Sequence, residues 1–291
     1  MLMIETTYDM VIPFVDNQDP VWQRIFIDYC NKHKLYKKIA DLHTDRYEDI
    51  GLINFQLKLI NKYLPWINKI YLLLMNREQA PKNLPSNVEI VYHGKFIPPQ
   101  FLPTFNSCTI EMFLWNIPNL SEHFIYANDD MLPFRTLSPC DFFDIKSGKI
   151  KIEWWEEDLN ECYNMFRLQC FNSYKHIATR LGKKLPNGVN FLRPAHSFTP
   201  MIKSHCKLAF ELVKDIAYQH IRAFRTEYQY NQYIYPLFEY FTIGTLPSKL
   251  DFVYTQCKEE TLDFNHDIVC INIVPKDKEK QVIEMLRESV K

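Results

Sequence analysis

Residues 9–15 read DMVIPFV and residues 16–20 read DNQDP, and this stretch decides the fold. The first seven residues form a nearly continuous apolar run, and the next five are polar or turn-forming. A short apolar run bounded by turn residues indicates a buried strand that feeds a loop. Such a strand is typical of the central sheet of an α/β protein. We therefore expect an α/β fold that is built outward from this strand.

The segments that follow continue the α/β pattern through the first half of the chain. Apolar residues at helical spacing predict helices over residues 21–39, 50–63 and 106–117. Apolar runs predict strands over Ile67–Leu74, Val88–Tyr92 and Phe124–Ala127. Strands that alternate with helices favour a mainly parallel sheet with helices on its faces.

The second half of the chain has a different character. Helical spacing predicts helices over residues 157–181, 200–221 and 226–241, and only Ile150–Trp154 has the pattern of a strand. The last stretch, 276–291, predicts a short amphipathic helix whose apolar face packs on the protein. We expect one domain over 1–291, with an α/β core at 1–148 and a mainly helical lobe at 149–291 that packs on the sheet.

Composition excludes two kinds of phosphate binder. The chain has only 6 glycines among 291 residues, against 21 Phe and 17 Tyr, which argues against a glycine-rich phosphate loop. Its formal charge is −1, with 34 basic and 35 acidic residues that are spread along the chain. A nucleic-acid partner is not expected, because no basic patch stands out.

Cysteine usage and hydropathy predict a cytoplasmic protein. Eight cysteines lie at positions 30, 108, 140, 162, 170, 206, 257 and 270, without a CxxC pair. We expect buried apolar thiols in a reducing compartment. The first residues do not resemble a secretory signal, and no stretch approaches the length of a membrane span. Peripheral docking on the inner membrane through aromatic and basic surface stays open.

Asn128, Asp129 and Asp130 directly follow the strand predicted at Phe124–Ala127. Ligands of α/β folds bind at the carboxyl ends of the strands, and carboxylate and amide oxygens suit Mg²⁺ or Mn²⁺. A metal held there would bridge a diphosphate. The alternative is an ordinary turn, because Asn and Asp are common turn residues.

Asp16 and Asp19 follow the first strand in the same way. If both strands are central, these acids face the same crevice as Asp129 and Asp130. Like charges gathered in a crevice cost free energy unless a cation offsets them. The alternative for Asp19 is a helix N-cap followed by Pro20 in the first turn.

Three further segments carry candidate catalytic residues. Arg46 and Asp49 precede a predicted helix, where an arginine can grip phosphate and a carboxylate can orient or deprotonate a hydroxyl. The alternative is a capping segment with solvated charges. His196 follows an apolar stretch, and Arg225 follows a predicted helix. A lone histidine is more often structural than catalytic.

These segments share motifs, in order, with a known family. The matching stretches are 9–22 (DMVIPFVDNQDPVW), 46–49 (RYED), 65–71 (PWINKIY), 102–107 (LPTFNS), 110–111 (IE), 117–121 (IPNLS), 124–131 (FIYANDDM) and 193–196 (RPAH) with Arg225. Together they resemble the Stealth family, which includes bacterial capsular polysaccharide phosphotransferases. Its relatives also include the catalytic core of the animal enzyme that adds N-acetylglucosamine-1-phosphate to lysosomal glycoproteins.

The chain departs from the family pattern at three places. The family's NDEL after Asp49 reads Ile50-Gly51-Leu52 here, so an acid and an amide are missing. Residues 15–20, VDNQDP, lack the glycine of the family's VDGSDP. The family's CLND-like segment is matched only by Cys270-Ile271-Asn272, without its aspartate. Contacts with the acceptor or the sugar are therefore expected to differ.

The resemblance implies a fold of the nucleotide-sugar transferase type, similar to GT-A or Rossmann folds. It also implies transfer of a hexose-1-phosphate or N-acetylhexosamine-1-phosphate from a nucleotide-diphosphate sugar to a hydroxyl of a surface polysaccharide or lipid-linked oligosaccharide. That reaction leaves a phosphodiester and a nucleoside monophosphate.

The resemblance assigns roles to individual residues. Mg²⁺ or Mn²⁺ would bind Asp129 and Asp130, with Asp16, Asp19 and Asn128 beside the bound nucleotide sugar. Arg46 and Arg225 would hold phosphoryl oxygens. His196 would be the general base, with Asp49 as the competing candidate.

Two other functions stay open at this point. A GT-A glycosyltransferase would use a similar fold and acidic metal site, but it attacks the anomeric carbon and releases nucleoside diphosphate. A family member without catalysis, which only binds sugar, would fit the altered segments around Gly51 and Asn272.

Overall fold

The apolar run at the start of the chain forms strand β1 (Tyr8–Pro13), as predicted. A computed structural model describes residues 6–39, 42, 45–160, 164–185, 190–257 and 262–290. The chain divides into two compact units. Unit 1 comprises Met1–Asp9, Gly94–Tyr126 and Pro139–Lys249, and unit 2 comprises Met10–His93, Ala127–Ser138 and Leu250–Lys291. The chain enters unit 2 for the last time after residue 249.

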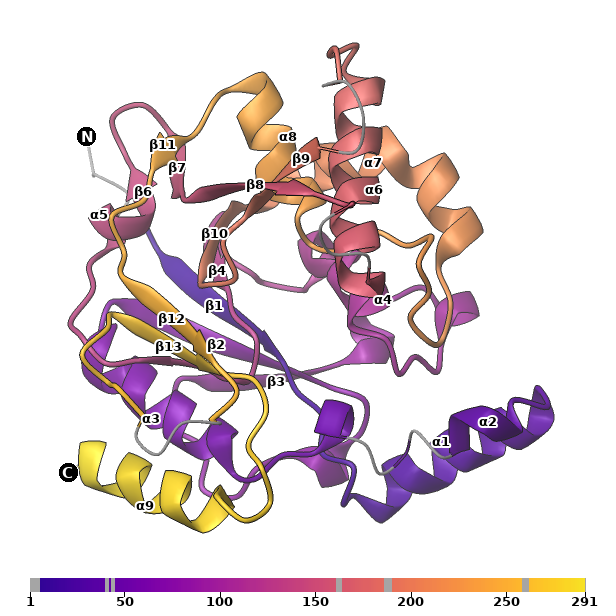
Figure 1. Ribbon diagram of the computed structural model, residues 1–291, viewed down its shortest axis with the longest axis vertical. Coiled ribbons are helices and arrows are strands. Elements are labelled where there is room, and N and C mark those ends of the chain that lie inside the picture. The colour runs from indigo at the N-terminus through magenta and orange to yellow at the C-terminus, as the bar shows by residue number, and fades with distance from the viewer. Residues whose placement is uncertain are drawn as a thin grey trace. The chain divides into compact units, whose positions relative to one another are not determined.

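The first sheet of unit 2 is the one that the opening stretch predicts. Residues of β1 from Met10 onward lie next to β2 (Ile67–Leu74), and β2 lies next to β3 (Val88–Tyr92) (Figure 1). Strands β2 and β3 run parallel, with Ile70 opposite Val88. Both strands have the predicted bounds, because each is an apolar run between turn residues.

Three helices of unit 2 follow the predicted helical spacing. They are α1 (Pro20–Lys32), α2 (Tyr36–Ile39) and α3 (Leu52–Tyr63). The single helix predicted over 21–39 is interrupted at Lys34, whose φ of 55° is left-handed and ends α1. Trp22, Phe26 and Cys30 form the buried face of α1 at four-residue spacing.

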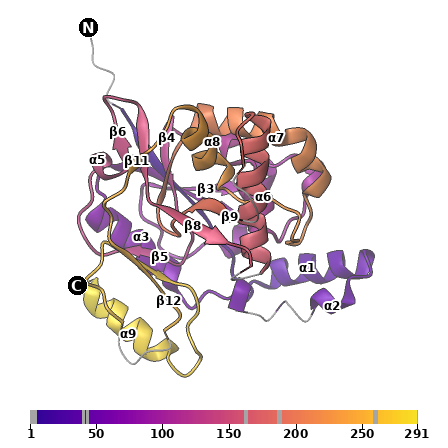
Figure 2. The same cartoon turned by 45° about the horizontal axis from the view of Figure 1, so that its top comes forward.

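A second sheet in unit 2 was not predicted. It has the order β12 (Phe252–Thr255), β13 (Ile268–Ile271) and β5 (Met131–Pro133). Strands β12 and β13 are parallel, and β13 and β5 are antiparallel. The tail forms helix α9 (Glu279–Ser289), drawn in yellow in Figure 2, as predicted. Its Val282 and Leu286 are buried in a core cluster with Leu59 and Val269.

Unit 1 contains neighbouring strands of a sheet and three helices that pack against one another. Strands β10 (Thr199–Ile202), β4 (His123–Tyr126) and the first residues of β1 lie in that order. Strands β10 and β4 are antiparallel. Helices α6 (Met165–Arg180), α7 (Lys203–His220) and α8 (Ile234–Thr242) pack against one another (Figures 1 and 2). The segment predicted as a helix over 106–117 is α4 (Ser107–Glu111) followed by a 3-10 turn at Leu114–Asn116.

Several short elements correct the helical prediction for the second half. The helix predicted from residue 157 begins at Met165, because Trp154–Asp158 forms β8, which pairs antiparallel with β9 (Asn190–Pro194). The helix predicted from residue 226 begins at Ile234. The remaining elements are α5 (Pro139–Phe142), β6 (Phe143–Asp144), β7 (Lys149–Ile152) and β11 (Leu246–Pro247), and 3-10 turns lie at Asp45–Tyr47, Arg77–Gln79, His93–Lys95 and Pro99–Phe101.

The observed class is the predicted one, a mixed α/β protein with a mainly parallel central sheet and helices. Among the cysteines that the structure describes, those at 30, 108, 170, 206, 257 and 270 are buried and free, as predicted, whereas Cys140 is exposed. Cys162 lies outside the described residues. None of the helices in the described ranges combines the length and the apolar character that crossing a bilayer requires.

Candidate functional site

An acidic turn follows the carboxyl end of the sheet in unit 2. The backbone N–H of Ala127 donates to the carbonyl of Val11 at 3.0 Å, which places this segment beside the end of β1. Asn128, Asp129 and Asp130 come next, and β5 begins at Met131. The structure thus puts the turn where parallel sheets bind ligands, as the sequence predicts.

Four carboxylates act on one another here. Burial raises the pKa of Asp129 well above its usual range, and the charges of Asp130 and Asp49 raise it further. Burial also raises the pKa of Asp49, from an ordinary 3.8 to about 6, with a smaller contribution from Asp16. A carboxyl whose ionisation is opposed by burial and by neighbouring acids, as for Asp129 and Asp49, favours either a proton or a cation. Asp16, Asp49, Asp129 and Asp130 therefore lie near one another in unit 2.

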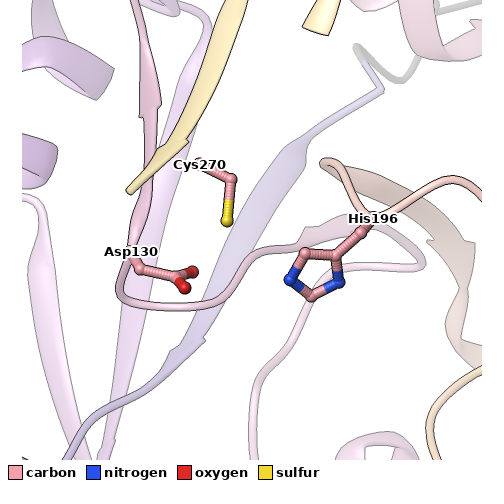
Figure 3. Close-up of side chains that lie close together, drawn as sticks. All are labelled: Asp130, His196 and Cys270. Carbon is pink, nitrogen blue, oxygen red and sulfur yellow. The ribbon is translucent and has the colours of Figure 1, made fainter. Parts of the chain in front are cut away.

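The two carboxylate oxygens of Asp130, whose side chain is drawn in Figure 3, differ in their hydrogen bonds. Its Oδ2 accepts a hydrogen bond of 3.1 Å from Nδ2 of Asn272, whereas its Oδ1 is buried and has no hydrogen-bond partner among the described residues. A buried carboxylate oxygen without a partner is costly, and a cation would satisfy it. These oxygen donors therefore fit Mg²⁺ or Mn²⁺.

Cys270 lies beside the same carboxylate. Its Sγ is within 4.8 Å of an Asp130 oxygen, and Figure 3 shows the two side chains facing each other from the ends of β13 and β5. Burial raises the pKa of the Cys270 thiol well above its usual range, and the charge of Asp130 raises it further. Cys270 and Asp130 are therefore neighbours at the acidic turn.

Two amide side chains that sequence reasoning did not assign support this turn. Nε2 of Gln56, in α3, donates to the backbone oxygens of Asn128 at 2.6 Å and Met131 at 2.7 Å. Asn272, just after β13, holds Asp130 and accepts from the Tyr254 hydroxyl at 2.7 Å. The partial CLND match pointed to Asn272, but Gln56 carries no signal in the sequence.

Asp16 and Asp19, in the loop after β1, make different hydrogen bonds. Asp19 is buried and caps α1, accepting from the N–H groups of Val21 and Trp22 at 3.0 Å, and Nδ2 of Asn76 donates to it at 2.7 Å. The N-cap interpretation of Asp19 is therefore confirmed. Asp16 is half-buried, and its Oδ1 accepts from the N–H of Gln18 at 2.8 Å.

Arg46 is exposed on the 3-10 turn at Asp45–Tyr47. This turn is tied to the loop after β1, because the N–H of Asn17 donates to the Tyr47 carbonyl at 2.7 Å and the Tyr47 ring packs on Trp22. Asp49 accepts from the N–H of Leu52 at 3.0 Å, at the start of α3. Asp49 thus binds the first N–H of α3, but its carboxyl is desolvated rather than solvated, whereas Arg46 is exposed.

Arg225 belongs to unit 1 and has its own support there. Its guanidinium donates to the Ser107 hydroxyl at 2.5 Å. Burial raises the pKa of Glu111, on the same short helix as Ser107, and the charge of Arg225 acts in the opposite direction. Ser107 and Glu111 lie in the LPTFNS and IE motifs, so the motif match could have identified both residues as part of the site.

His196 also belongs to unit 1, on the turn between β9 and β10, and is labelled in Figure 3. Its ring meets Phe166 edge to face at 6.2 Å. The preceding strand is anchored by Arg193, which pairs with Glu157 at 2.5 Å and lies over the ring of Trp155 at 4.6 Å. The half-buried His196 is thus held by a rigid strand end.

An α/β fold with acids gathered where its strands end is the arrangement of a ligand-binding α/β enzyme. Comparison with known proteins defines it further. The family model "Stealth protein CR2, conserved region 2" matches residues 46–151. The capsular polysaccharide phosphotransferase cps1A of Actinobacillus pleuropneumoniae is 32% identical over 258 residues, which cover 86% of this chain and 70% of that protein. The chain therefore belongs to the Stealth family, as the sequence motifs predict.

Two further similarities complete the comparison. The capsular polysaccharide phosphotransferase LcbA of Neisseria meningitidis is 40% identical over 139 residues, which cover 46% of this chain and 37% of that protein. The crystal structure of the galactosyltransferase LgtC with donor and acceptor sugar analogues aligns over 97% of this chain and 95% of its own, with 10% identity and a TM-score of 0.38.

Proposed function

We propose that the chain transfers a sugar-1-phosphate from a nucleotide-diphosphate sugar to a hydroxyl group of a surface polysaccharide or lipid-linked oligosaccharide. Family membership supports the reaction class, and the unpartnered Oδ1 of Asp130 inside an acidic cluster carries the proposal. The acceptor oxygen attacks the phosphorus that bears the sugar, and the bond from that phosphorus to the bridging oxygen breaks. The hydroxyl proton passes to a base, and nucleoside monophosphate leaves.

The acidic cluster would hold a divalent metal. Asp129 and Asp130 are the charged ligands that we propose, and Asn272 orients Asp130. When bound, Mg²⁺ or Mn²⁺ supplies positive charge that offsets the diphosphate. Asn128, Asp16 and Asp19 would border the bound nucleotide sugar. For Asp19 this role would be indirect, because both its oxygens already accept hydrogen bonds.

Two arginines would act on phosphate. The exposed guanidinium of Arg46 is available to a donor at the acidic loop. Arg225 keeps the role that the family motif implies, and its bond to Ser107 fixes one edge of its planar fork. An arginine binds phosphate oxygens in pairs and stabilises their charge in the transition state.

We assign proton abstraction to His196 on the family motif, and Asp49 is the competing base. A general base works best when its pKa lies near the working pH. Histidine has such a pKa without any perturbation. Burial raises the pKa of Asp49 to about 6, so Asp49 is also suited to act as the general base.

The released nucleotide tests this proposal against its rivals. The protein would be incubated with a panel of nucleotide sugars, an acceptor extract and Mg²⁺, and the nucleotide product identified by chromatography. We expect nucleoside monophosphate. Nucleoside diphosphate would show a glycosyltransferase, and donor binding without turnover would show a member that only binds sugar.

We also propose that the protein works in the cytoplasm, at the inner surface of the membrane. Residues 31–37 are all exposed, and Lys32, Lys34, Lys37 and Lys38 flank Leu35 and Tyr36, whose side chains are 36% and 62% exposed. Basic residues around exposed apolar and aromatic side chains suit an anionic lipid surface. Sedimentation with anionic vesicles tests this. Binding should be lost in a Lys34→Glu/Lys37→Glu variant, and failure of the wild type to bind would refute it.

A further inference from the structure

Gln56 occupies an unusual position in helix α3. It lies on the buried face of the helix, among Ile53, Leu57 and Ile60, and its exposed fraction is 0%. An apolar residue would suit this position, because burying an amide costs free energy unless its polar atoms are bonded. Its Oε1 is buried and has no hydrogen-bond partner among the described residues. The two bonds made by its Nε2 are therefore what offsets the cost of burying it.

Those two bonds enclose the proposed metal ligands. Nε2 donates to the carbonyl of Asn128 at 2.6 Å and to that of Met131 at 2.7 Å, the residues on either side of Asp129 and Asp130. A primary amide carries two N–H donors, so one nitrogen can bind both carbonyls at once. A carboxylate or a thioether at this position could donate to neither.

The turn has only a weak hydrogen bond of its own to hold its two ends together. Within the turn itself, the N–H of Met131 reaches the Asn128 carbonyl at 3.3 Å, a long bond. The shorter bonds from Gln56 hold both ends of the turn from the rigid helix.

We propose that Gln56 is a positioning residue that sets the Asp129-Asp130 turn in the geometry that binds the divalent metal. This inference rests on the proposed metal site. It concerns a residue of the region that the family model matches, and it predicts that metal affinity depends on a side chain that never touches the metal.

The test compares two glutamine-to-methionine variants in the full chain. Gln56→Met fills the same space but donates no hydrogen bond. Gln169→Met is the matched control, because Gln169 is also buried on a helix, at 2% exposure, and donates to the backbone oxygen of Thr226 at 2.8 Å. Mn²⁺ affinity is measured by the paramagnetic resonance of the free ion, and thermal unfolding is followed in chelator and in excess Mn²⁺.

We expect Gln56→Met to weaken Mn²⁺ binding by about 10-fold, the usual effect of losing an outer-shell partner. Gln169→Met should keep wild-type affinity although both variants unfold at lower temperature in chelator. Gln56→Asn, which keeps the amide but is too short to reach both carbonyls, should also bind Mn²⁺ more weakly. Unchanged affinity in both Gln56 variants, or equal losses in Gln56→Met and Gln169→Met, would overturn the inference. Wild-type protein that binds no Mn²⁺ would instead refute the metal site itself.

Discussion

Replacing Asp49 by asparagine is expected to stabilise the metal-free protein and to lower its turnover. Burial raises the pKa of this carboxyl from 3.8 to about 6, and Asp16 contributes to the rise. Asparagine keeps an oxygen that can accept from the N–H of Leu52, the bond of 3.0 Å that Asp49 makes now. The substitution therefore removes an unfavourable charge and preserves the local structure at the start of α3.

The sign and size of the effect follow from proton linkage. Below pH 3.8 both the folded and the unfolded carboxyl hold a proton, so ionisation makes no contribution to stability. As the pH rises to about 6, the unfolded state ionises first and the folded state loses stability. A pKa difference of about two corresponds to roughly 3 kcal/mol, and solvent around this partly exposed side chain reduces it to about 2 kcal/mol.

Urea unfolding in chelator, at about pH 4 and about pH 7.5, measures this difference. The free energy of unfolding of Asp49→Asn should exceed that of the wild type by about 2 kcal/mol at the higher pH. At the lower pH the two values should agree within about 0.5 kcal/mol. Asp28→Asn, which removes an exposed acid on α1, is the control and should change neither value by more than about 0.5 kcal/mol. If Asp49→Asn shows no increase in the free energy of unfolding near neutral pH, or the same increase at both pH values, burial does not oppose the ionisation of Asp49.

The remaining predictions concern catalysis. Asp129→Asn and Asp130→Asn should each abolish turnover and leave the fold intact by circular dichroism, and full activity in chelator would contradict the metal site. Arg46→Lys and Arg225→Lys should lower kcat far more than the melting temperature, because lysine keeps the charge but loses the planar fork; near-normal kinetics in both would make them structural. His196→Ala should lower kcat by about 10²–10⁴-fold with little change in donor binding, and it should remove the acidic limb of the pH–rate profile. A much larger loss in Asp49→Asn than in His196→Ala would make Asp49 the base.

Parts of the fold could be predicted because their pattern is local. Strands β2 and β3 have the predicted bounds, since each is mostly apolar with turn residues on both sides. Strands β8 and β12 were missed, because a half-buried strand of four or five residues shows too few alternations to be told from a helix turn. The predicted helix over 21–39 failed at Lys34, where the backbone becomes left-handed without a glycine to mark it.

The sequence by itself determined the family, the α/β class and the acids of the candidate site. Asp16, Asp129 and Asp130 could be placed together, because the carboxyl ends of neighbouring strands meet at one edge of a sheet. Only the tertiary structure decided what holds these acids. Gln56 bonds to Asn128 across 72 residues of chain, and Asn272 reaches Asp130 across 142. Contacts of such separation are set by how α3 and β13 pack, and a buried glutamine inside a helix gives no local sign of the turn that it supports.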